Sequence, residues 1–446
     1  MAKATINYVC QECGYDSPQW LGKCPECGSW NSFKELKIPS VTSRNKNTSL
    51  RSSTARDNTP KPLSSISFKE TNRISTSYIE MDGVLGGGIV PGSVTLLAGD
   101  PGIGKSTLLL QLALSIAKDS KKPILYISGE ESEEQIKLRA SRIAPKSTSD
   151  NFLLLSLTDS DQIAQIILDT KPGLVILDSI QTMESENVAG LSGAIGQVRY
   201  AAQQFISVAK SNNIPFIIVG HVTKEGTVAG PMVLSHMVDC VLFLEGEKFT
   251  STRILRSLKN RFGPVDEVGI FLMEGEGMVE VKHPEQLFLG NLDNDKAVPG
   301  SVMVVTLEGT RAFLVELQAL VLPSKLAYPR RVVSGVDARR LELLLAVLQK
   351  HCRIPLDSYD VFLNVAGGLK LSDPGVDLGI CLAVYSSFKN KALQKTVGIA
   401  EVGLLGELRK VPMLEKRTKE ATKLGFKSVL SVAKFKTLGQ VLAALD

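Results

Sequence analysis

Nine consecutive residues constrain this chain more than any other feature. They match the spacing G-x-x-x-x-G-K-[ST] of a phosphate-binding loop: Gly99, Asp100, Pro101, Gly102, Ile103, Gly104, Lys105, Ser106 and Thr107. The glycines let the backbone turn sharply and bring several N–H groups close to phosphate oxygens. Lys105 offers an ammonium to the outer phosphates, and the Ser106 hydroxyl is a ligand for Mg²⁺. An apolar run over 93–98 predicts a buried strand before the loop, and apolar residues over 109–117 recur at helical spacing after it. This context predicts a nucleotide phosphate site.

Three polar residues, Glu130, Asp178 and His221, each stand at the end of a later apolar run. In a parallel sheet such residues reach the ligand crevice at the carboxyl ends of the strands. Asp178 has the position of a Walker B acid that holds Mg²⁺ opposite Ser106. Glu130 either polarises the water that attacks the γ-phosphate or caps the next helix, and Glu131 fits the capping role better. His221 is a candidate for contacting the γ-phosphate on position alone.

Composition limits the class of protein. The chain has 446 residues, 43% of them apolar and 22% charged, which predicts a globular protein of about two or three domains. No apolar run approaches the ~18 residues that span a membrane, and residues 1–10 lack the apolar segment of a signal peptide. We therefore expect a cytoplasmic protein with no membrane partner. In that compartment Cys240, Cys352 and Cys381 are expected to be buried thiols.

The other four cysteines form two C-x-x-C pairs separated by ten residues: Cys10 with Cys13, and Cys24 with Cys27. Two such pairs supply the thiolates of a tetrahedral Zn²⁺ site, and a rubredoxin-like iron site is the alternative. A module this small depends on its metal for folding. Both tryptophans of the chain, Trp20 and Trp30, lie here with Tyr15 and Phe33. These aromatic rings either cover the metal as a small core or stack on nucleobases.

Residues 36–65 are rich in Ser, Thr, Asn and Pro and poor in large apolar side chains. They cannot bury enough surface to fold alone, so we expect a flexible linker. Within them, residues 37–61 carry a net charge of +5. Such a segment is either a solvated linker or a contact to nucleic acid.

Two stretches, 183–199 and 222–235, show few helix or strand signals, and long irregular loops inside an α/β domain are usually functional. Further along, 238–245 and 251–260 alternate in the manner of two strands. The second of these runs into the KNRFG segment (residues 259–263) at a predicted hairpin turn. Spacing alone leaves Lys259 and Arg261 as solvated cations.

The phosphate loop, the strand-end acids, the cysteine pairs and the KNRFG segment together resemble the bacterial RadA (Sms) DNA-repair family over essentially the whole chain. The resemblance implies a RecA-type ATPase core in a hexameric ring. It makes Glu130 the catalytic carboxylate and His221 a sensor, and it implies that Lys259 and Arg261 reach the γ-phosphate of a neighbouring subunit. The stretches 183–199 and 222–235 would then face single-stranded DNA in the pore, with candidate phosphate contacts at Arg199 and Lys224.

Residues 284–446 are similar to the proteolytic domain of Lon. A Lon-type peptidase needs a serine nucleophile activated by a lysine. Asp377 stands at the expected nucleophile position and Glu415, beside Lys416, at the expected lysine position, so we expect a peptidase fold without peptidase activity. The segment 323–340 has a net charge of +4 and is either a duplex-DNA contact or a solvated surface. Its basic residues are Lys325, Arg330, Arg331, Arg339 and Arg340.

The predicted protein is therefore an α/β chain of four parts. They are a C4 zinc ribbon-like module (7–35), a basic linker (36–65), a RecA-type parallel-sheet ATPase domain (66–283) and a Lon-protease-like domain (284–446). The predicted function is a DNA-dependent ATPase that uses ATP, Mg²⁺ and Zn²⁺ and drives branch migration of recombination intermediates with the RecA recombinase. An ATP-dependent Lon-type protease and a nucleotide-switched scaffold ATPase are the alternatives.

Overall fold

The computed structural model describes residues 5–10, 15–26, 28–38, 60, 62–65, 73–145, 149–221, 230–246, 251–281 and 298–446. The chain divides into two compact units. The first comprises residues 1–245, 253–265 and 273–279, and the second comprises 246–252, 266–272 and 280–446. The four-part division drawn from the sequence stays a prediction. Most of the predicted linker lies outside the described residues, apart from 36–38, 60 and 62–65.

The N-terminal module is a small antiparallel sheet with the strand order β2-β1-β3. Its strands are β1 (Thr5–Cys10), β2 (Asp16–Ser17) and β3 (Phe33–Ile38). Cys10, at the end of β1, and Cys24 are both buried beside Phe33. A short helical turn, η1 (Leu63–Ser65), is described further along the chain.

A nine-stranded sheet has the order β12-β11-β10-β9-β4-β8-β7-β5-β6, and its strands belong mainly to the first unit, apart from most of β11, of which 268–272 belong to the second. Strands β4 to β9 are parallel to one another, and β10 returns antiparallel to β9. Parallel strands covered on both faces have nearly continuous apolar sequences, as in the LVILD of β7. The strands are β4 (Val94–Gly99), β5 (Ile124–Ser128), β6 (Phe152–Ser156), β7 (Leu174–Asp178), β8 (Phe216–His221), β9 (Cys240–Glu245), β10 (Thr252–Asn260), β11 (Val268–Glu274) and β12 (Gly277–Glu280).

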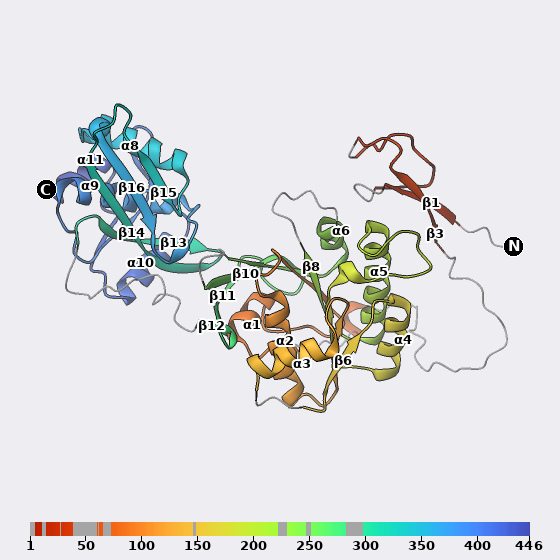
Figure 1. The fold of residues 1–446 in the computed structure, drawn as a ribbon. Coiled ribbons are helices and arrows are strands. Elements are labelled where there is room, and N and C mark those ends of the chain that lie inside the picture. Colours follow the sequence, from red (N-terminus) through yellow and green to blue (C-terminus); the bar gives the residue numbers. More distant parts are fainter. Residues whose placement is uncertain are drawn as a thin grey trace, which may run out of the picture. The chain divides into compact units, whose positions relative to one another are not determined.

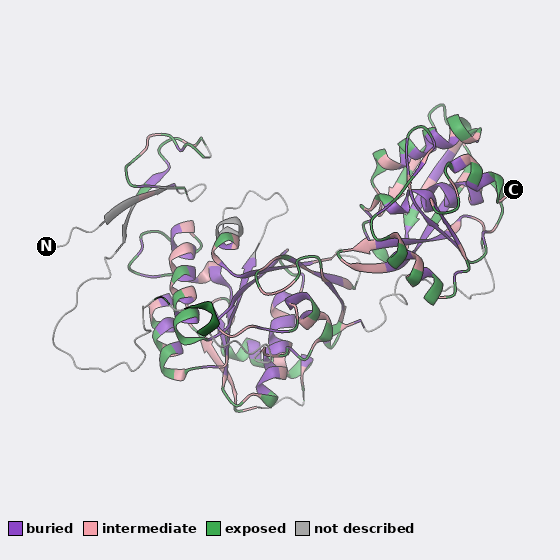
Figure 2. Ribbon diagram, turned by 180° about the vertical axis from the view of Figure 1, so that it is seen from behind, coloured by how far each residue is buried: buried purple, intermediate pink, exposed green. Residues whose placement is uncertain are grey.

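Helices cover both faces of this sheet (Figure 1). They are α1 (Ile79–Leu85), α2 (Lys105–Asp119), α3 (Glu133–Ile143), α4 (Ser160–Thr170), α5 (Ile195–Asn212) and α6 (Gly230–Met237), with a short turn η3 (Ile180–Thr182) after β7. The connections through α2 and α3 step toward β6, whereas those through α4, α5 and α6 step back. Right-handed crossovers therefore place α2 and α3 on one face and α4 to α6 on the other. Figure 2 shows the strands between them as buried.

Two predicted loops are partly helical. The stretch 183–199 includes the start of α5 at Ile195, and 222–235 includes the start of α6 at Gly230, while 222–229 lie outside the described residues. The sequence signal was hidden because residues with low helix propensity precede each helix, Gly and Ser before α5 and Gly and Thr before α6. In α5 the apolar side chains Val198, Ala201 and Phe205 recur at helical spacing and are buried in the core.

The second unit is built on a mixed sheet with the order β15-β16-β14-β13-β17-β20. Its strands are β13 (Ser301–Glu308), β14 (Arg311–Pro323), β15 (Arg331–Ser334), β16 (Tyr359–Val365), β17 (Thr396–Ile399) and β20 (Ser428–Ser431), with a separate ribbon of β18 (Glu401–Val402) and β19 (Leu408–Arg409). Its helices are α8 (Ala338–Cys352), α9 (Asp377–Lys389), α10 (Leu414–Lys423) and α11 (Leu438–Ala443), with short turns η4 (Leu356–Ser358), η5 (Ala366–Gly368) and η6 (Pro374–Val376).

Neighbouring residues of β13 show how the helices pack on this sheet. Val304 faces α9, because a Cβ at Gly379 would lie only 1.9 Å from its Cγ1 atom. Met303 and Val305 form a core cluster with Ala421 of α10. Since successive side chains of a strand point to opposite faces, α9 and α10 cover opposite faces of the sheet.

Candidate nucleotide site

The phosphate loop connects the end of β4 to the start of α2. Gly102 and Gly104 both have positive φ, at 75° and 112°, a conformation that side-chain-bearing residues rarely adopt. A Cβ at Gly104 would also lie 2.4 Å from the methyl group of Met273. Glycine is therefore required where the loop turns into the helix, and the positive end of the α2 dipole faces the loop.

Lys105 lies beneath this loop, with only 4% of the residue exposed. Its ammonium donates to the carbonyl oxygens of Gly99 (2.8 Å) and Asp100 (2.9 Å). Burial lowers the pKa of Lys105, while the carboxylates of Asp178, Asp100 and Glu130 oppose that shift. The ammonium is thus held within electrostatic reach of the acids that the sequence predicted beside it.

Strand register brings the predicted residues to one edge of the sheet. Gly99 of β4 pairs with His221 of β8, and Ser128 of β5 pairs with Asp178 of β7. These positions are the carboxyl ends of four parallel strands, where ligands bind in open α/β sheets. The side chain of His221 lies outside the described residues, so only its backbone position is established.

Asp178 and Glu130 are each oriented by a hydroxyl group that the sequence analysis did not identify. The Tyr126 hydroxyl donates to Asp178 Oδ2 at 2.7 Å, and the Ser179 hydroxyl donates to Glu130 Oε1 at 2.7 Å. Burial and the neighbouring Asp178 raise the pKa of Tyr126 well above its usual value, so the phenol keeps its proton and remains a donor. The sequence could have identified Ser179, because it directly follows the strand-end acid Asp178. It could not have identified Tyr126, because nothing distinguishes this aromatic residue from the other side chains of an apolar strand.

The sequence suggested that Glu131 caps the helix after β5, but the structure shows that it does not. Ser132 is the N-cap of α3 and forms a capping box with Gln135, while Glu131 forms an ion pair with Arg139 at 2.7 Å. A Ser hydroxyl reaches the first helical N–H groups from the N-cap position itself, so the acid one residue earlier is not needed. Glu130 has no part in the cap and lies beside Ser179.

Arg253 of β10 supports the phosphate loop from a distant part of the chain. Its Nε atom donates to the carbonyl oxygen of Ile103 at 3.1 Å, and the residue is buried. Burial lowers the pKa of Arg253, although such a group stays charged at neutral pH. Nothing in the alternating sequence of β10 distinguishes this arginine from a solvated one.

The KNRFG segment lies at the opposite edge of the same sheet. Its backbone is held there because the N–H of Arg261 donates to the carbonyl oxygen of Asp239 at 3.2 Å, and Asp239 itself bonds to Val94, the first residue of β4. The phosphate loop follows Gly99, at the other end of β4, roughly 16 Å away at the rise of a strand. Lys259 and Arg261 therefore cannot reach the phosphate loop of their own subunit.

Side chains of the KNRFG segment are engaged within the unit. The Lys259 ammonium donates to the carbonyl oxygens of Ser235 (2.7 Å) and Val238 (2.8 Å) at the end of α6, where a cation is favoured by the helix dipole. Burial lowers the pKa of Lys259, and the charge of Arg261 lowers it further. Lys259 must exchange these carbonyl oxygens for any phosphate it contacts.

Asp239 is a buried anchor for this edge and was not predicted. Only 3% of the residue is exposed, and its carboxylate accepts from the Val94 N–H (3.0 Å), from Lys210 and from Arg261 (3.5 Å). It therefore links the start of β4, the end of α5 and the KNRFG segment. A buried carboxylate needs such partners because desolvation disfavours its charge.

The structure describes only one of the two candidate DNA contacts, Arg199 and Lys224. Arg199 lies within α5 and is half-buried, so the prediction of a loop position for it was wrong. The loop ahead of α5 is tied down by Gln197, whose amide accepts from the Ser185 N–H and donates to the Val188 carbonyl oxygen. Lys224 lies outside the described residues.

The N-terminal module shows two matching turns around its cysteines. The Cys10 N–H donates to the Tyr15 carbonyl oxygen and the Cys24 N–H to the Ser29 carbonyl oxygen, each at 2.9 Å and each five residues ahead. Cys10 and Cys24 are buried, whereas Cys13 and Cys27 lie outside the described residues, which contain no metal-ligating cluster without them. Two equivalent turns with inward thiols fit a four-thiolate metal site, in which the metal would cross-link the turns.

Replacing Cys10 and Cys24 with serine should remove the metal from the purified protein. A hydroxyl group binds Zn²⁺ far more weakly than a thiolate, and two ligands cannot hold a structural site. Metal analysis by mass spectrometry would show about one Zn²⁺ per parent chain and none in the variant. Cys352→Ser is the control, and stoichiometric iron in the parent would favour the rubredoxin-like alternative.

Comparison with known proteins agrees with this geometry. A family model described as an AAA domain matches residues 60–227, and one described as a rubredoxin metal binding domain matches residues 8–35. The DNA repair protein RadA of Halalkalibacterium halodurans is 47% identical over 433 residues, covering 96% of this chain and 93% of that protein. The chain belongs to the RadA family. RadA of Bacillus subtilis is 45% identical over 431 residues, with 96% and 93% coverage, so the predicted family resemblance is confirmed.

Among solved structures, a RadB recombinase is 25% identical with a TM-score of 0.38, and it covers 47% of this chain and 100% of that chain. This similarity is confined to less than half of the RadA-family chain, and no residue role is taken from it. Within the described residues, none of the helices has both the length and the apolar character needed to cross a bilayer.

The predicted peptidase position in this RadA-family chain holds a structural ion pair. Asp377, at the start of α9, is 1% exposed and pairs with both the Nε and Nη2 atoms of Arg340; its Oδ2 also accepts from the Val402 N–H. Burial raises the pKa of Asp377, and the Arg340 charge opposes that shift. Glu415 and Lys416 are exposed on α10, whose buried cation is Arg417. The described residues show no serine–lysine pair at this position.

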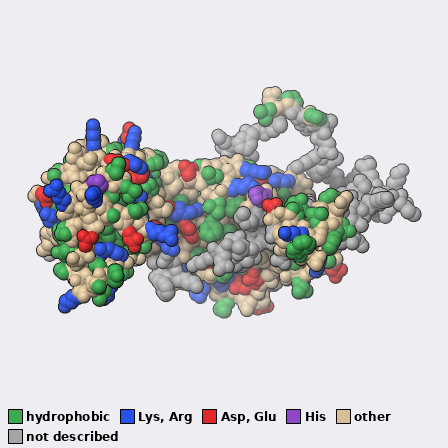
Figure 3. All heavy atoms as spheres, turned by 90° about the horizontal axis from the view of Figure 1, so that it is seen from above, with side chains coloured by type: hydrophobic (Ala, Val, Ile, Leu, Met, Phe, Trp, Pro, Cys, Tyr) green, Lys and Arg blue, Asp and Glu red, His purple; other side chains and the backbone are tan. Residues whose placement is uncertain are grey.

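The basic segment 323–340 divides into two groups. Arg340 is bound to Asp377, and Arg331 donates to the carbonyl oxygens of Leu356 and Tyr359, so both would have to give up these contacts to bind DNA, and their DNA role stays a prediction. A buried or half-buried carboxylate or carbonyl holds a guanidinium more firmly than solvent does. The exposed basic residues are Lys325, Arg330 and Arg339. Acidic and basic side chains are intermixed on the face of the second unit seen in Figure 3.

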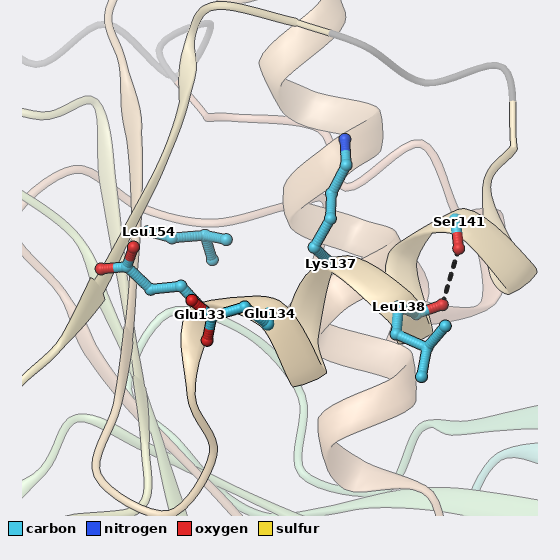
Figure 4. A pocket seen from close by; sticks show the side chains of 6 residues that line it. All are labelled: Glu133, Glu134, Lys137, Leu138, Ser141 and Leu154. Atoms are coloured by element: carbon cyan, nitrogen blue, oxygen red, sulfur yellow. Dashed lines mark hydrogen bonds between the residues drawn. The ribbon is translucent and has the colours of Figure 1, made fainter.

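One shallow pocket lies away from the phosphate loop, between α3 and the edge strand β6. It is lined by Glu133, Glu134, Lys137, Leu138, Ser141 and Leu154 (Figure 4). The Ser141 hydroxyl is bonded to the Leu138 carbonyl oxygen at 2.8 Å, and none of the lining residues belongs to the nucleotide site. Three strands separate β6 from β4 in the sheet, so this pocket is not part of the phosphate site.

Proposed function

We propose that this protein is a DNA-dependent ATPase of recombinational repair that works as a ring motor on single-stranded DNA. One observation carries the proposal. The phosphate loop and the KNRFG segment occupy opposite edges of one sheet, so Lys259 and Arg261, if they act on the γ-phosphate as we propose, must act on the nucleotide site of another copy. Head-to-tail contacts of this kind form a ring when the rotation between copies closes, and a closed ring is the form that we propose. The hexamer and the RecA recombinase as a partner are part of this proposal.

The chain's own residues account for ATP hydrolysis. N–H groups of residues 102–107 cradle the phosphates, and the Lys105 ammonium moves from the loop carbonyl oxygens to the outer phosphates. Glu130, oriented by Ser179, accepts the proton of the attacking water. Ser106 and Asp178 would hold Mg²⁺, which neutralises charge on the β- and γ-phosphates when bound. His221 ends β8 beside the loop and reports loss of the γ-phosphate to residues 222–235.

The proposed coupling to DNA runs through the KNRFG segment. Lys259 is bound to the carbonyl oxygens that end α6, and α6 follows the stretch that contains Lys224. When Lys259 turns to the γ-phosphate of the neighbouring subunit, it releases the end of α6. Hydrolysis can thereby change the stretch that we propose contacts single-stranded DNA during branch migration. Such a protein acts in the cytoplasm, where bacterial DNA lies.

Adding single-stranded DNA should increase the ATPase rate, and Lys259→Ala should remove most of that increase while ATP binding is retained. A trans-acting cation stabilises transition-state charge strongly, so we expect the DNA-stimulated ATPase rate of Lys259→Ala to be at least about 100-fold lower than that of the parent. Phosphate release with and without oligonucleotide measures both effects. Lys137→Ala, an exposed lysine on α3, is the matched control.

A mixing experiment tests the trans arrangement directly. Lys105→Ala subunits lack a working phosphate loop but supply Lys259, whereas Lys259→Ala subunits do the reverse. Mixing the two inactive variants should restore part of the hydrolysis. If the mixture stays inactive although mixed rings form, the trans role is wrong.

The two alternative functions are less well supported. We propose that the second unit is a Lon-like domain that serves assembly rather than proteolysis, because Asp377 is committed to Arg340 and lacks a nucleophilic hydroxyl. A scaffold ATPase would hydrolyse ATP at the same rate with and without DNA. The same phosphate-release assay therefore separates that alternative from a motor.

A further inference from the structure

The two tryptophans of the chain are both at the surface of the N-terminal module. Trp20 is 53% exposed and Trp30 is 71% exposed, whereas Phe33 is buried beside Cys10 and Cys24. Of the two alternatives for these aromatic residues, the small core applies to Phe33, on which the Tyr15 ring packs edge to face at 6.3 Å, whereas both tryptophans lie at the surface. Exposed tryptophan rings give up a large hydrophobic stabilisation, and such rings mark interaction surfaces.

Both rings are carried by the short ribbon that flanks the second cysteine turn, with Trp20 before that turn and Trp30 after it. A Cβ at Gly22 would lie 3.7 Å from the Trp20 ring, so this ring lies against the backbone. The Asn31 N–H donates to the Gly22 carbonyl oxygen at 2.8 Å, and Lys23 is the bridge partner of Trp30. The Lys23 ammonium lies 5.5 Å from the centre of the Trp30 ring. We define Trp20, Lys23 and Trp30 as the tryptophan surface.

We propose that the tryptophan surface binds single-stranded nucleic acid by stacking its rings on unpaired bases. This inference rests on the proposed function, in which single-stranded DNA is the ligand of the protein. A flat ring with an adjacent ammonium matches a base with its phosphate, since stacking is tolerant of sequence and the cation neutralises the backbone. Residues 37–61, which follow the module, add a net charge of +5 that favours the same polyanion.

Duplex DNA fits this surface less well, because its bases are already stacked on one another. A protein partner would also use exposed tryptophans, but it offers no general reason for the lysine beside Trp30. Single-stranded DNA is therefore the ligand that the charge and the ring together favour. The contributions of stacking and charge can be removed separately, by Trp30→Ala and by Lys23→Gln.

Intrinsic fluorescence gives a direct test, because the chain contains only these two tryptophans. In full-length Trp20→Phe protein, all tryptophan emission comes from Trp30, and in Trp30→Phe protein it comes from Trp20. Titration with an oligo(dT) strand, without nucleotide, should quench each emission to saturation. Trp30→Ala should weaken oligonucleotide binding about 10-fold, and Trp30→Phe should restore most of it because phenylalanine also stacks. Lys23→Gln should reduce the slope of log affinity against log salt by about 1.

Anisotropy of a labelled oligo(dT) measures binding independently of the tryptophans. If the labelled strand binds while both emissions stay unchanged, the inference is wrong and the proposed function stands. If the strand does not bind to the parent protein at all, both are wrong. Metal content of each variant identifies misfolding of the module, and the two phenylalanine variants keep the quenching test valid even if Trp30→Ala loses its metal.

Discussion

Lys105→Ala should reduce ATP hydrolysis by about 100- to 1,000-fold, the loss typical when one preorganised charge donor is removed from an active site. The side chain is buried beneath the phosphate loop and reaches two of its carbonyl oxygens, so it is already oriented before a nucleotide arrives. Alanine leaves the loop backbone intact but removes the only ammonium that the described residues place within the loop. Phosphate release at saturating MgATP measures the effect.

A suitable control for this variant lies on the same helix. Lys118 is exposed in the last turn of α2, so Lys118→Ala changes the charge of the helix equally without touching the loop. We expect it to hydrolyse ATP at the parent rate. Hydrolysis by Lys105→Ala at more than about a tenth of the parent rate would contradict the assignment of the loop.

Glu130→Gln should lower kcat by about 100- to 10,000-fold while ATP still binds, because general-base catalysis contributes rates of that order. Glutamine can keep the contact with the Ser179 hydroxyl but cannot accept a proton from water. Nucleotide affinity, measured with a fluorescent ATP analogue, should change little, since the proposed role of Glu130 is to accept a proton from water and not to hold the phosphates. This separation of binding from turnover distinguishes Glu130 from Lys105.

The neighbouring acid provides the matched control. Glu131 forms an ion pair with Arg139, so Glu131→Gln should change stability slightly and leave kcat near that of the parent. Ser179→Ala should lower kcat less than Glu130→Gln, because it only frees the carboxylate from its hydroxyl partner. Equal kcat values for Glu130→Gln and the parent would show that another group activates the water.

Some features of this protein were predictable from the sequence because short segments determine them. The phosphate loop needs glycines at a given spacing, and Gly102 and Gly104 have the positive φ angles that this requirement implies. The apolar runs over 93–98 and 238–245 match the parallel strands β4 and β9 within about two residues, because strands buried on both faces leave few alternatives. The strand-end positions of Glu130, Asp178 and His221 followed from the same reasoning.

Other local patterns were ambiguous. The starts of α5 and α6 were missed because Gly, Ser or Thr residues of low helix propensity precede them, and helix boundaries are the least certain part of a periodic pattern. Trp20 and Trp30 were compatible with a core or with a surface, and their exposure was decided by how a module of about 30 residues folds around its cysteines. Arg340 had the same spacing as its exposed neighbours, but it lies opposite the buried Asp377.

The sequence by itself therefore determined a phosphate loop and a metal-binding module, and it predicted a peptidase-like domain without its nucleophile. Only the tertiary structure decided which side chains support that chemistry. Tyr126 meets Asp178 from 52 residues away, and Arg253 meets Ile103 from 150 residues away. It also placed Lys259 and Arg261 at the edge of the sheet opposite their own phosphate loop. The physical reason is that a local pattern constrains neighbouring dihedral angles, whereas partners distant in sequence meet only when strand order and register are set.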